Sequence, residues 1–373
     1  MQQRHSGVNE SVGMLLVDAG DSIRQVMQRI DRGARGIALV ADGAGRLRAT
    51  VTDGDVRRAI LDGLRLDEPV SALLGRRGPE EHPITAAAGT GDDELRRMME
   101  QHKVRHLPLL DADGRIVDLV MREQLDGRGD LPVRAVIMAG GFGRRLKPLT
   151  RNTPKPMLPV GERPLIELTV ERLRDAGIHR LHISTHYLAD RIKGHFGDGR
   201  DFGVSVSYLD ESRPMGTAGA LGLLERAAEP LLVINGDILT GVDYAQMLSY
   251  HREHGAELTV AVRQYGMEVP YGVVRCEGER VVDLQEKPTV DFLVNAGIYL
   301  LEPGVLELIP SDRRFDMPEL IRAAAGDGRR VVSFPVVEYW LDVGRIEDYR
   351  AAQVAVAQGA WRWPPVRDRP LAG

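Results

Sequence analysis

The sequence predicts an α/β protein built from two different parts, and three observations lead to this expectation. Residues 14–126 contain the same helix-and-hairpin pattern twice. From residue 134 onward, short apolar strand candidates alternate with helix candidates, which is typical of an open sheet flanked by helices. The stretch "LDGRGDLPV" lies between the two patterns and has a linker composition. We therefore expect a repeat pair at 1–126, a linker at 127–133, a mixed, mainly parallel α/β domain at 134–358 and a tail at 359–373.

Composition limits the class of protein before any motif is considered. The chain has 373 residues, which is more than one hydrophobic core usually supports. Its net charge is −5 and it contains no long basic block, so we expect no nucleic-acid partner. No apolar run is long enough to span a bilayer. The single cysteine, Cys276, cannot form an internal disulfide, so we expect a cytoplasmic protein.

The two N-terminal repeats, at about 14–70 and 80–126, each predict a helix followed by a hairpin. In each hairpin, Asp and Gly separate two apolar runs, as in "LPLLDADGRIV", which favours a turn. One repeat cannot bury its apolar face alone, so the two copies should pack on each other. The apolar helix positions are Ile23, Val26, Met27 and Ile30 behind a capping Asp21 or Ser22, and Leu95, Met98 and Met99 behind Asp92 and Asp93.

The repeat pair resembles a tandem pair of CBS domains. In that family a Thr or Ser, followed three residues later by Asp, holds the ribose and phosphate of an adenine nucleotide. Thr52 and Asp55 match that spacing, whereas Met121 and Gln124 occupy the corresponding places of the second repeat. The resemblance therefore implies at most one good site for an adenine nucleotide. Thr52 and Asp55 could instead simply cap the helix that follows them.

The C-terminal part begins with a strand candidate and a glycine-rich loop. In a largely parallel sheet, ligands bind beyond the carboxyl ends of the strands. The loop "AGGFGRRLKPLTRNTPKPMLPVG" follows one such strand, and Asp237 follows another. The strand candidates are "AVIMA", "LHIST", "VSVSY", "LLVIN", "LTVAV" and "AGIYLL", and "PLIELTVERLRDAG" predicts a helix with proline near its start and Gly177 at its end.

The loop has the composition of a polyphosphate site. It lacks the third glycine of the dinucleotide fingerprint, which argues against an oxidoreductase, and it lacks the Lys-Ser/Thr of the Walker loop. Gly140, Gly141 and Gly143 allow close approach of backbone N–H groups to phosphate. Arg145 adds a forked donor and Lys155 a compact charge. Taken alone, the three glycines could equally form a turn with solvated basic residues.

The whole loop is similar to the signature of sugar-1-phosphate nucleotidyltransferases, the family that includes GDP-sugar pyrophosphorylases. The resemblance runs through residues 134–353 and implies the fold of nucleotide-diphospho-sugar transferases. One departure is Arg144, where many members have Thr, and it should alter the phosphate pocket only in detail. The further motifs, in the family's order, are "MGTAGAL", "NGDIL", "VPYGVV", "EKP", "NAGIYLL" and "YWLDVG".

The resemblance implies transfer of a nucleotide from a nucleoside triphosphate to a sugar 1-phosphate, with release of pyrophosphate. Asp237 and Asp342 would hold Mg²⁺, since carboxylates are suitable ligands for a hard cation. Lys155 would stabilise charge at the α-phosphorus and Arg145 would hold the leaving pyrophosphate. Gly216 and Thr217 belong to the base loop, Lys287 would hold the sugar phosphate, and Tyr271, Gly272, Glu286 and Asn295 would contact the sugar. Read singly, the two aspartates could be Asx-turn residues, and Tyr271 and Asn295 ordinary packing and turn residues.

The nucleobase depends on Glu211, which lies upstream of Gly216. A carboxylate could accept both N–H groups of the guanine edge, whereas uracil and thymine offer one N–H between two carbonyls. We therefore expect GTP, with a hexose or hexosamine 1-phosphate such as that of mannose or glucosamine. A UTP- or dTTP-using glucose-1-phosphate transferase and a catalytically silent nucleotide sensor are the alternatives. A homo-oligomer is expected, while the role of the CBS pair, in regulation or only in assembly, stays open.

Overall fold

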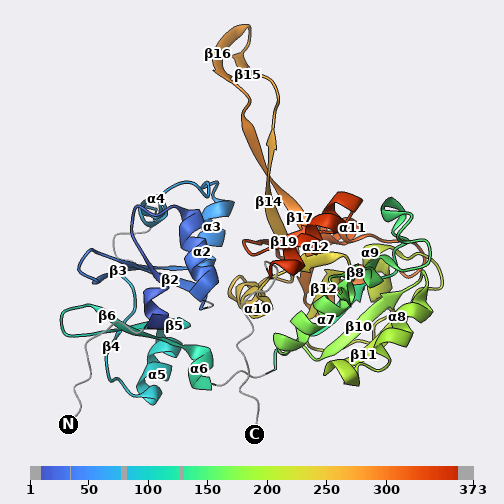
Figure 1. The fold of residues 1–373 in the computed structure, drawn as a ribbon, viewed down its shortest axis with the longest axis horizontal. Coiled ribbons are helices and arrows are strands. Elements are labelled where there is room, and N and C mark those ends of the chain that lie inside the picture. The colour runs from blue at the N-terminus through green and yellow to red at the C-terminus, as the bar shows by residue number, and fades with distance from the viewer. Residues whose placement is uncertain (1–9, 34, 77–81, 127–129, 360–373) are drawn as a thin grey trace. The chain divides into compact units, whose positions relative to one another are not determined.

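The computed structural model describes residues 10–33, 35–76, 82–126 and 130–359 (Figure 1). The chain divides into two compact units, and the boundary lies between Leu131 and Pro132. The predicted linker contains this boundary. Most of the predicted tail, including Trp361 and Trp363, lies outside the described residues.

The first unit contains the predicted repeat, with the same strand order in both copies. In each copy a short strand pairs in parallel with the first strand of a hairpin, whose two strands are antiparallel. This repetition confirms the hairpins expected from the sequence. The elements are α1 (Glu10–Gly13), β1 (Leu16–Val17), α2 (Ile23–Gly33), β2 (Ile37–Ala41), β3 (Leu47–Thr52), α3 (Asp53–Leu61) and α4 (Val70–Leu74), then β4 (Ala86–Ala87), α5 (Asp92–His102), β5 (His106–Leu110), β6 (Ile116–Met121) and α6 (Arg122–Asp126).

The two repeats pack on each other, as expected for units that cannot bury an apolar face alone. The turns of the two hairpins are hydrogen-bonded to each other, with Leu47 N donating to Gly114 O and Ile116 N donating to Gly45 O, both at 3.2 Å. One hydrophobic cluster contains Ile37 and Leu39 from the first repeat and Ile116 and Leu119 from the second.

The second unit is organised around a seven-stranded sheet in the order β11-β10-β7-β12-β17-β14-β18. Within this described sheet β17 runs opposite to the other strands, so the sheet is mixed and mostly parallel, as predicted. The strands are β7 (Arg134–Met138), β10 (Arg180–Thr185), β11 (Ser205–Asp210), β12 (Leu231–Asn235), β14 (Leu258–Glu268), β17 (Thr289–Leu301) and β18 (Val331–Pro335).

Helices pack on the sheet, and the remaining strands form separate two-stranded ribbons (Figure 1). The predicted helix at 164–177 forms α7 (Leu165–Asp175), preceded by Pro164 as its N-cap residue. The other helices are α8 (Ala189–Phe196), α9 (Gly216–Gly219), α10 (Tyr244–Glu253), α11 (Met317–Gly326) and α12 (Ile346–Ala357). The remaining strands are β8 (Pro159–Val160), β9 (Arg163–Pro164), β13 (Ile238–Thr240), β15 (Val273–Glu277), β16 (Arg280–Gln285) and β19 (Trp340–Asp342).

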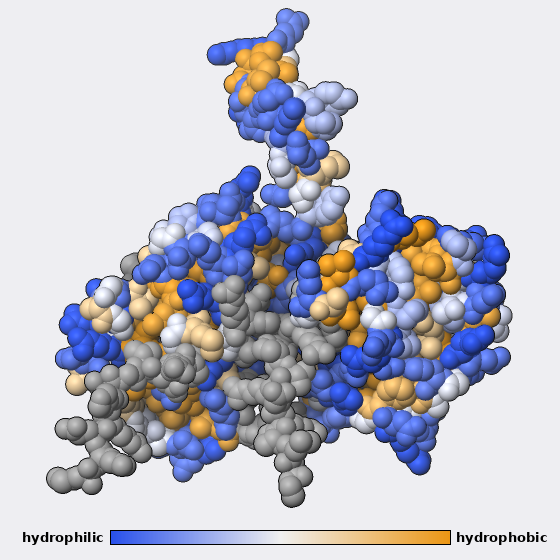
Figure 2. Space-filling model, viewed as in Figure 1, coloured by the Kyte–Doolittle hydropathy of each residue, from blue (hydrophilic) through white to orange (hydrophobic). Residues whose placement is uncertain are grey.

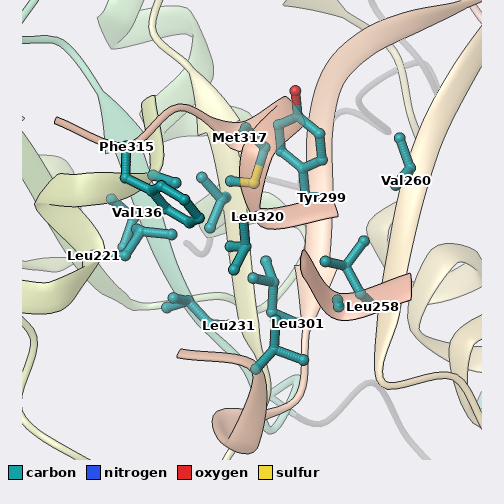
Figure 3. Packing of buried hydrophobic residues seen from close by; sticks show 14 of the residues in the cluster. Val136, Leu221, Leu231, Leu258, Val260, Tyr299, Leu301, Phe315, Met317 and Leu320 are labelled. Atoms are coloured by element: carbon teal, nitrogen blue, oxygen red, sulfur yellow. The ribbon is translucent and has the colours of Figure 1, made fainter. Parts of the chain in front are cut away.

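A large hydrophobic core lies between the sheet and α11 (Figure 3). Val233 of β12 and Tyr299 and Leu301 of β17 face Met317 and Leu320 of α11, and all five are buried. This packing fixes β12 and β17 in the middle of the sheet. It therefore fixes the carboxyl end of β12, where Asp237 follows.

Two strands of the sheet continue beyond it as a projecting arm (Figure 1). We call residues 263–294 the arm. It contains the outer parts of β14 and β17, an irregular stretch on each side, and the β15–β16 hairpin at its end. The sequence predicted a strand only at 258–262 and at 296–301, so the arm was not anticipated.

Candidate active site

The glycine-rich loop lies at the carboxyl end of β7 and is folded tightly on itself. Gly143 has a φ of 59°, a conformation that favours glycine. A Cβ atom there would lie 2.9–3.0 Å from the side chains of Thr150 and Lys155. The Thr150 hydroxyl donates to Gly143 O at 2.8 Å, and Leu146 is fully buried below the loop. The loop is therefore a preformed structure.

The other two glycines of the loop differ in their surroundings. A Cβ atom at Gly140 would overlap the Glu211 carboxylate, so this position requires a glycine for close approach. Nothing lies within 4 Å of the corresponding point at Gly141. The backbone is thus open at Gly141, which suits a ligand that accepts hydrogen bonds from main-chain N–H groups.

Lys155 lies between the two predicted metal-binding aspartates. Its Nζ contacts Asp237 Oδ2 and is 4.0 Å from Asp342 Oδ1. Lys155 is only 9% exposed, so its charge is held in place by the fold. Asp237 and Asp342 follow Lys155 by 82 and 187 residues in the sequence, and the fold brings all three side chains together. The family resemblance implied this grouping.

The pairing of β13 with β19 brings the two aspartates together. Ile238, the residue after Asp237, pairs with Asp342 in the antiparallel register. Val343 N also donates to Asp237 O at 2.9 Å. Backbone hydrogen bonds therefore hold the two segments that carry Asp237 and Asp342 next to each other, without any ligand.

The electrostatics of this centre favour an added cation. Burial raises the pKa of the Asp342 carboxyl, and the neighbouring Asp237 raises it further, while Lys155 and Arg145 act in the opposite direction. Within the described residues, no cluster of three or more His, Cys, Asp or Glu side chains could hold a metal.

The predicted base loop is tied to the segment before α11. Gly216 has a φ of 89°, and a Cβ atom there would lie 2.6 Å from both Asp316 Oδ1 and Phe315 O. Thr217 N donates to Asp316 Oδ1 at 2.9 Å. The side chain of Asp316 is a positioning contact that the sequence motifs did not single out.

Glu211 connects the glycine-rich loop with the base loop. Its Oε2 accepts from Met215 N at 2.9 Å, and its other side faces Gly140. Burial raises the pKa of the Glu211 carboxyl, while the Met215 N–H and His186 lower it. A hydrogen bond with the Ser184 side chain lowers the pKa of Glu211 as well, so the carboxylate braces the two loops from β10 and from the base loop.

An aromatic group at the carboxyl end of β10 supports the glycine-rich loop. The ring of Phe142 packs against His186 and Tyr187, with centroids 5.6 and 5.5 Å apart. The Tyr187 hydroxyl donates to Arg151 O at 2.9 Å. Sequence reasoning did not assign these residues a role, although "HY" directly after a strand at the ligand edge was an available signal.

The predicted sugar-binding residues are divided between two places. Tyr271, Gly272, Glu286 and Lys287 lie in the irregular middle of the arm, where the Glu286 carboxylate lies over Gly272. Asn295 lies at the base of the arm, and Trp340 Nε1 of β19 donates to the adjacent Ala296 O at 2.8 Å. The structure therefore brings Asn295 close to the element that carries Asp342, but leaves the other four residues together on the arm.

Thr52 and Asp55 form a capping box at the start of α3. Asp55 N donates to Thr52 Oγ1 at 3.2 Å, and Thr52 N donates to Asp55 Oδ2 at 2.8 Å. In the second repeat, Gln124 accepts from Met121 N at 2.9 Å, so only half of the box is retained. Capping explains the spacing of Thr52 and Asp55; their contact with an adenine nucleotide stays a prediction.

Comparison with known proteins assigns both units to families. Residues 134–359 match the nucleotidyl transferase family, and residues 11–62 and 79–125 match the CBS domain. The chain therefore belongs to the nucleotidyl transferase family and carries a tandem CBS pair. This confirms both resemblances seen in the sequence.

Several named proteins are similar to the C-terminal unit. Mannose-1-phosphate guanylyltransferase of Mycobacterium tuberculosis is 34% identical over 243 residues, covering 63% of this chain and 67% of that protein. UTP–glucose-1-phosphate uridylyltransferase of Synechocystis sp. is 31% identical over 238 residues, covering 58% and 61%. The chain thus spans about two thirds of the relatives' length.

Solved structures of the same kind also match. A putative glucose-1-phosphate thymidylyltransferase from Bacillus anthracis is 27% identical with a TM-score of 0.48, covering 60% of this chain and 94% of that one. HddC from Yersinia pseudotuberculosis is 27% identical with a TM-score of 0.47, covering 60% and 99%.

Proposed function

We propose that this chain is a Mg²⁺-dependent sugar-1-phosphate nucleotidyltransferase that uses GTP. The observation that carries the proposal is the position of Lys155 between Asp237 and Asp342, beside a glycine-rich loop at the carboxyl edge of the sheet. In the reaction, an oxygen of the sugar phosphate attacks the α-phosphorus of GTP. The bond between the α-phosphorus and the bridging oxygen breaks, and pyrophosphate leaves.

The site is suited to this reaction because the main obstacle to the reaction is repulsion between two negatively charged substrates. The sugar phosphate is already an anion near neutral pH, since its second pKa is about 6, so no general base is needed. Two anions must instead be brought together and aligned. Lys155 offers its charge to the α-phosphate, and the guanidinium of Arg145 lies near Asp342 and Gly344, where it can hold the pyrophosphate.

Asp237 and Asp342 are the residues that would hold Mg²⁺. The bound ion supplies neutralisation of phosphate charge, as in other phosphoryl-transfer enzymes. The two carboxylates fit this task for two reasons. Asp237 is close enough to Asp342 to raise its pKa, so the pair would gain from a cation. Both side chains also remain partly exposed to solvent, where phosphate oxygens can reach them.

The preference for GTP is supported by two independent facts. Relatives at 32–35% identity are named mannose-1-phosphate guanylyltransferases. Glu211 has a carboxylate oxygen beside Gly140, next to the loop that would hold the triphosphate. The uridylyltransferase of Synechocystis keeps UTP as the second candidate.

The cysteine content and the helices bear on where the protein is located. No described helix combines the length and apolarity needed to cross a membrane. The single cysteine favours a reducing compartment, so we infer a cytoplasmic enzyme.

The experiment that tests the proposal is pyrophosphate release in the presence of Mg²⁺. GTP, UTP, dTTP, CTP and ATP are each offered with a panel of hexose and hexosamine 1-phosphates. Release with GTP and one sugar phosphate, lost in Asp237→Asn, is the expected result. Absence of release with every pairing, including after addition of AMP or ATP as CBS effectors, would favour a silent sensor.

Glu211→Gln tests whether the Glu211 carboxylate recognises the guanine base of GTP. Glutamine keeps an oxygen that can accept from Met215 N, so the brace between the loops is preserved. It replaces the second acceptor by an amide donor, which should repel the guanine N–H groups. We expect kcat/KM to fall roughly 10- to 100-fold for GTP, the effect of one hydrogen bond to a charged group, and less for UTP. An equal loss with every nucleotide would show that Glu211 acts only as a brace.

A further inference from the structure

The β13–β19 ribbon carries both predicted metal-binding aspartates at one end. Asp342 is the last residue of β19 and lies opposite Ile238, which follows Asp237. We call the opposite end the far end of the ribbon, where Gly241 N donates to Tyr339 O at 2.9 Å. The far end is three residues away on each strand, which is roughly 10 Å at about 3.3 Å per residue. Contacts that fix the far end therefore also restrict the direction of the two carboxylates.

Arg172 of α7 holds the segment that follows β13. Its Nη2 donates to Gly241 O at 3.0 Å and to Val242 O at 3.3 Å. Two successive carbonyl groups that accept from one nitrogen fix the orientation of two neighbouring peptide planes. The helix α7 packs against β13, so the arginine reaches the far end of the ribbon from a regular, well-packed element.

Arg263 of β14 holds the segment that precedes β19. Its Nη1 donates to Val336 O at 2.8 Å and to Glu338 O at 3.0 Å. Val336 N also donates to Val262 O at 2.6 Å, so β14 contacts this segment through backbone and side chain. Arg263 is half-buried at the base of the arm, whereas the outer arm projects from its unit into the solvent (Figure 2). The contact therefore belongs to the body of the unit and not to the exposed arm.

The surroundings of Arg172 show that this contact is more than a surface hydrogen bond. Among the described side chains, Arg172 Nε and Tyr244 Oη are buried and have no hydrogen-bond partner. A buried donor without a partner costs free energy that an apolar side chain would avoid. Burial raises the pKa of Tyr244 to about 12, and the nearby charges of Arg172 and Glu338 act on that pKa in opposite directions. The fold thus keeps a charged side chain here in spite of its cost, with Nη2 directed at the far end of the ribbon.

We propose that Arg172 and Arg263 are positioning residues for the metal centre. Each holds one of the two segments at the far end of the β13–β19 ribbon, so that Asp237 and Asp342 keep their arrangement when a divalent cation binds. Their effect is transmitted through the backbone of the ribbon. Loss of groups that orient metal ligands commonly weakens metal binding about 10- to 100-fold. This proposal rests on the proposed function for the role of the two aspartates.

The first test measures binding of Mn²⁺ alone to the full chain, without nucleotide, from the electron paramagnetic resonance signal of free Mn²⁺. Arg172→Met and Arg263→Met keep a long side chain but lose both hydrogen bonds to the segment. We expect the dissociation constant for Mn²⁺ to rise about 10- to 100-fold in each variant. Arg174→Met is the matched control, because Arg174 is a half-buried arginine of the same helix whose Nη1 donates to Phe202 O at 3.3 Å. Its dissociation constant should equal that of the wild type.

Three results of this titration would overturn the proposal. The first is a wild type that binds no more Mn²⁺ than Asp237→Asn, since there would then be no metal centre to position. The second is equal affinity in the wild type and in both methionine variants. The third is an equal loss in Arg174→Met, because the effect would then follow from removing any half-buried arginine of this unit.

The lysine variants Arg172→Lys and Arg263→Lys serve where a methionine variant does not fold. In each arginine one nitrogen makes both hydrogen bonds, so a lysine nitrogen can replace it in part. Because the lysine side chain is one bond shorter and lacks the planar guanidinium, we expect Mn²⁺ affinity several-fold below that of the wild type. Wild-type affinity in both lysine variants would contradict the proposal.

The second test asks whether the two arginines act on the same ribbon. If release of either strand already loosens the far end, the second substitution has little left to remove. The variant that combines Arg172→Met and Arg263→Met should then bind Mn²⁺ only slightly more weakly than either single variant. Independent residues would instead give a loss equal to the product of the two single losses, and that result would contradict a shared action on the ribbon.

Enzyme activity separates this proposal from the proposed function. If the wild type releases no pyrophosphate with any substrate pair, the proposed function fails, while the Mn²⁺ titrations still decide whether the arginines position the aspartates. In an active enzyme, the Mg²⁺ concentration for half-maximal rate should rise in Arg172→Met and Arg263→Met, with a smaller change in kcat at saturating Mg²⁺. A fall in kcat with an unchanged Mg²⁺ dependence would contradict the positioning role.

Discussion

The carboxylate centre and the middle of the arm carry two halves of one predicted substrate site, yet they are built very differently. At the centre, Lys155 is 9% exposed and contacts a carboxylate, and the β13–β19 pairing holds both aspartates. In the middle of the arm, Tyr271 is 74% exposed. Lys155 and the two aspartates are thus preorganised by the fold, whereas most of the residues predicted to bind the sugar phosphate are presented on a projecting ribbon (Figure 1).

The difference has a physical reason. A buried lysine is stable only when an opposite charge is held next to it, so charges of this kind must be fixed by the fold itself. Residues that hydrogen-bond sugar hydroxyls are stable in water and can remain exposed until substrate or a partner covers them. The difference predicts separate kinetic effects for the two regions.

Lys155→Ala should have the largest effect, because in the proposed reaction it removes a preorganised charge at the α-phosphorus. We expect kcat to fall about 10²- to 10³-fold, the usual cost of losing one such donor, with a smaller change in KM. Steady-state pyrophosphate release measures both. Lys193→Ala is the matched control, since Lys193 forms a similar ion pair with Asp210 at 2.7 Å on the surface and should leave kcat unchanged. A similar fall in kcat in both variants would show that Lys155 has no specific role in the reaction.

Lys287→Ala should have an intermediate effect, and on a different parameter. A charge that binds the phosphate of the sugar contributes roughly 1.5–3 kcal/mol, so KM for the sugar phosphate should rise about 10- to 150-fold. The KM for GTP should stay near the wild-type value. Arg280→Ala, at the exposed end of the arm, serves as the control. A fall in kcat without a change in KM would remove the distinction between centre and arm.

Asp342→Asn should have the smallest effect, and it concerns stability. The folded protein raises the pKa of this carboxyl, so its charged form is less favourable in the folded state than in the unfolded chain. Stability is therefore lost as the pH rises from the unfolded pKa, about 3.9, through the raised folded pKa. The neutral variant should melt at most a few degrees higher at pH 7, and this effect on stability is separate from the loss of activity expected when a proposed metal ligand is removed.

The pH dependence of this last effect gives its control. The gain in melting temperature should shrink as the pH is lowered through the raised pKa of Asp342, because the wild-type carboxyl then takes up a proton and becomes neutral as well. Asp201→Asn, at an exposed position, should shift the melting temperature little at any pH. A variant that is less stable than wild type at pH 7 would show that the attraction of Lys155 outweighs the repulsion from Asp237.

Much of the fold was predictable because its signals are local. Short apolar runs between helix candidates indicate β7, β10, β11 and β12, and turns containing Asp and Gly indicate the two hairpins of the CBS pair. The strand-end rule placed the glycine-rich loop and Asp237 at the same edge, and β7 and β12 are indeed neighbours, with Met138 opposite Asn235. The arm was missed because strands were predicted only at 258–262 and 296–301, and a local pattern does not show how far a ribbon continues beyond its sheet.

The sequence by itself determined the family, the repeat, the mostly parallel sheet and the identity of the charged residues, because these depend on residue type and short-range periodicity. Only the tertiary structure decided that Lys155 contacts Asp237, that Glu211 braces two loops through Met215 N, and that Thr52 and Asp55 cap a helix. It also decided that Tyr271, Gly272, Glu286 and Lys287 lie on a projecting ribbon, whereas Asn295 lies at its base near β19 (Figure 1). Distances between segments depend on strand register and on how far a ribbon continues beyond its sheet, and neither is encoded in a local pattern.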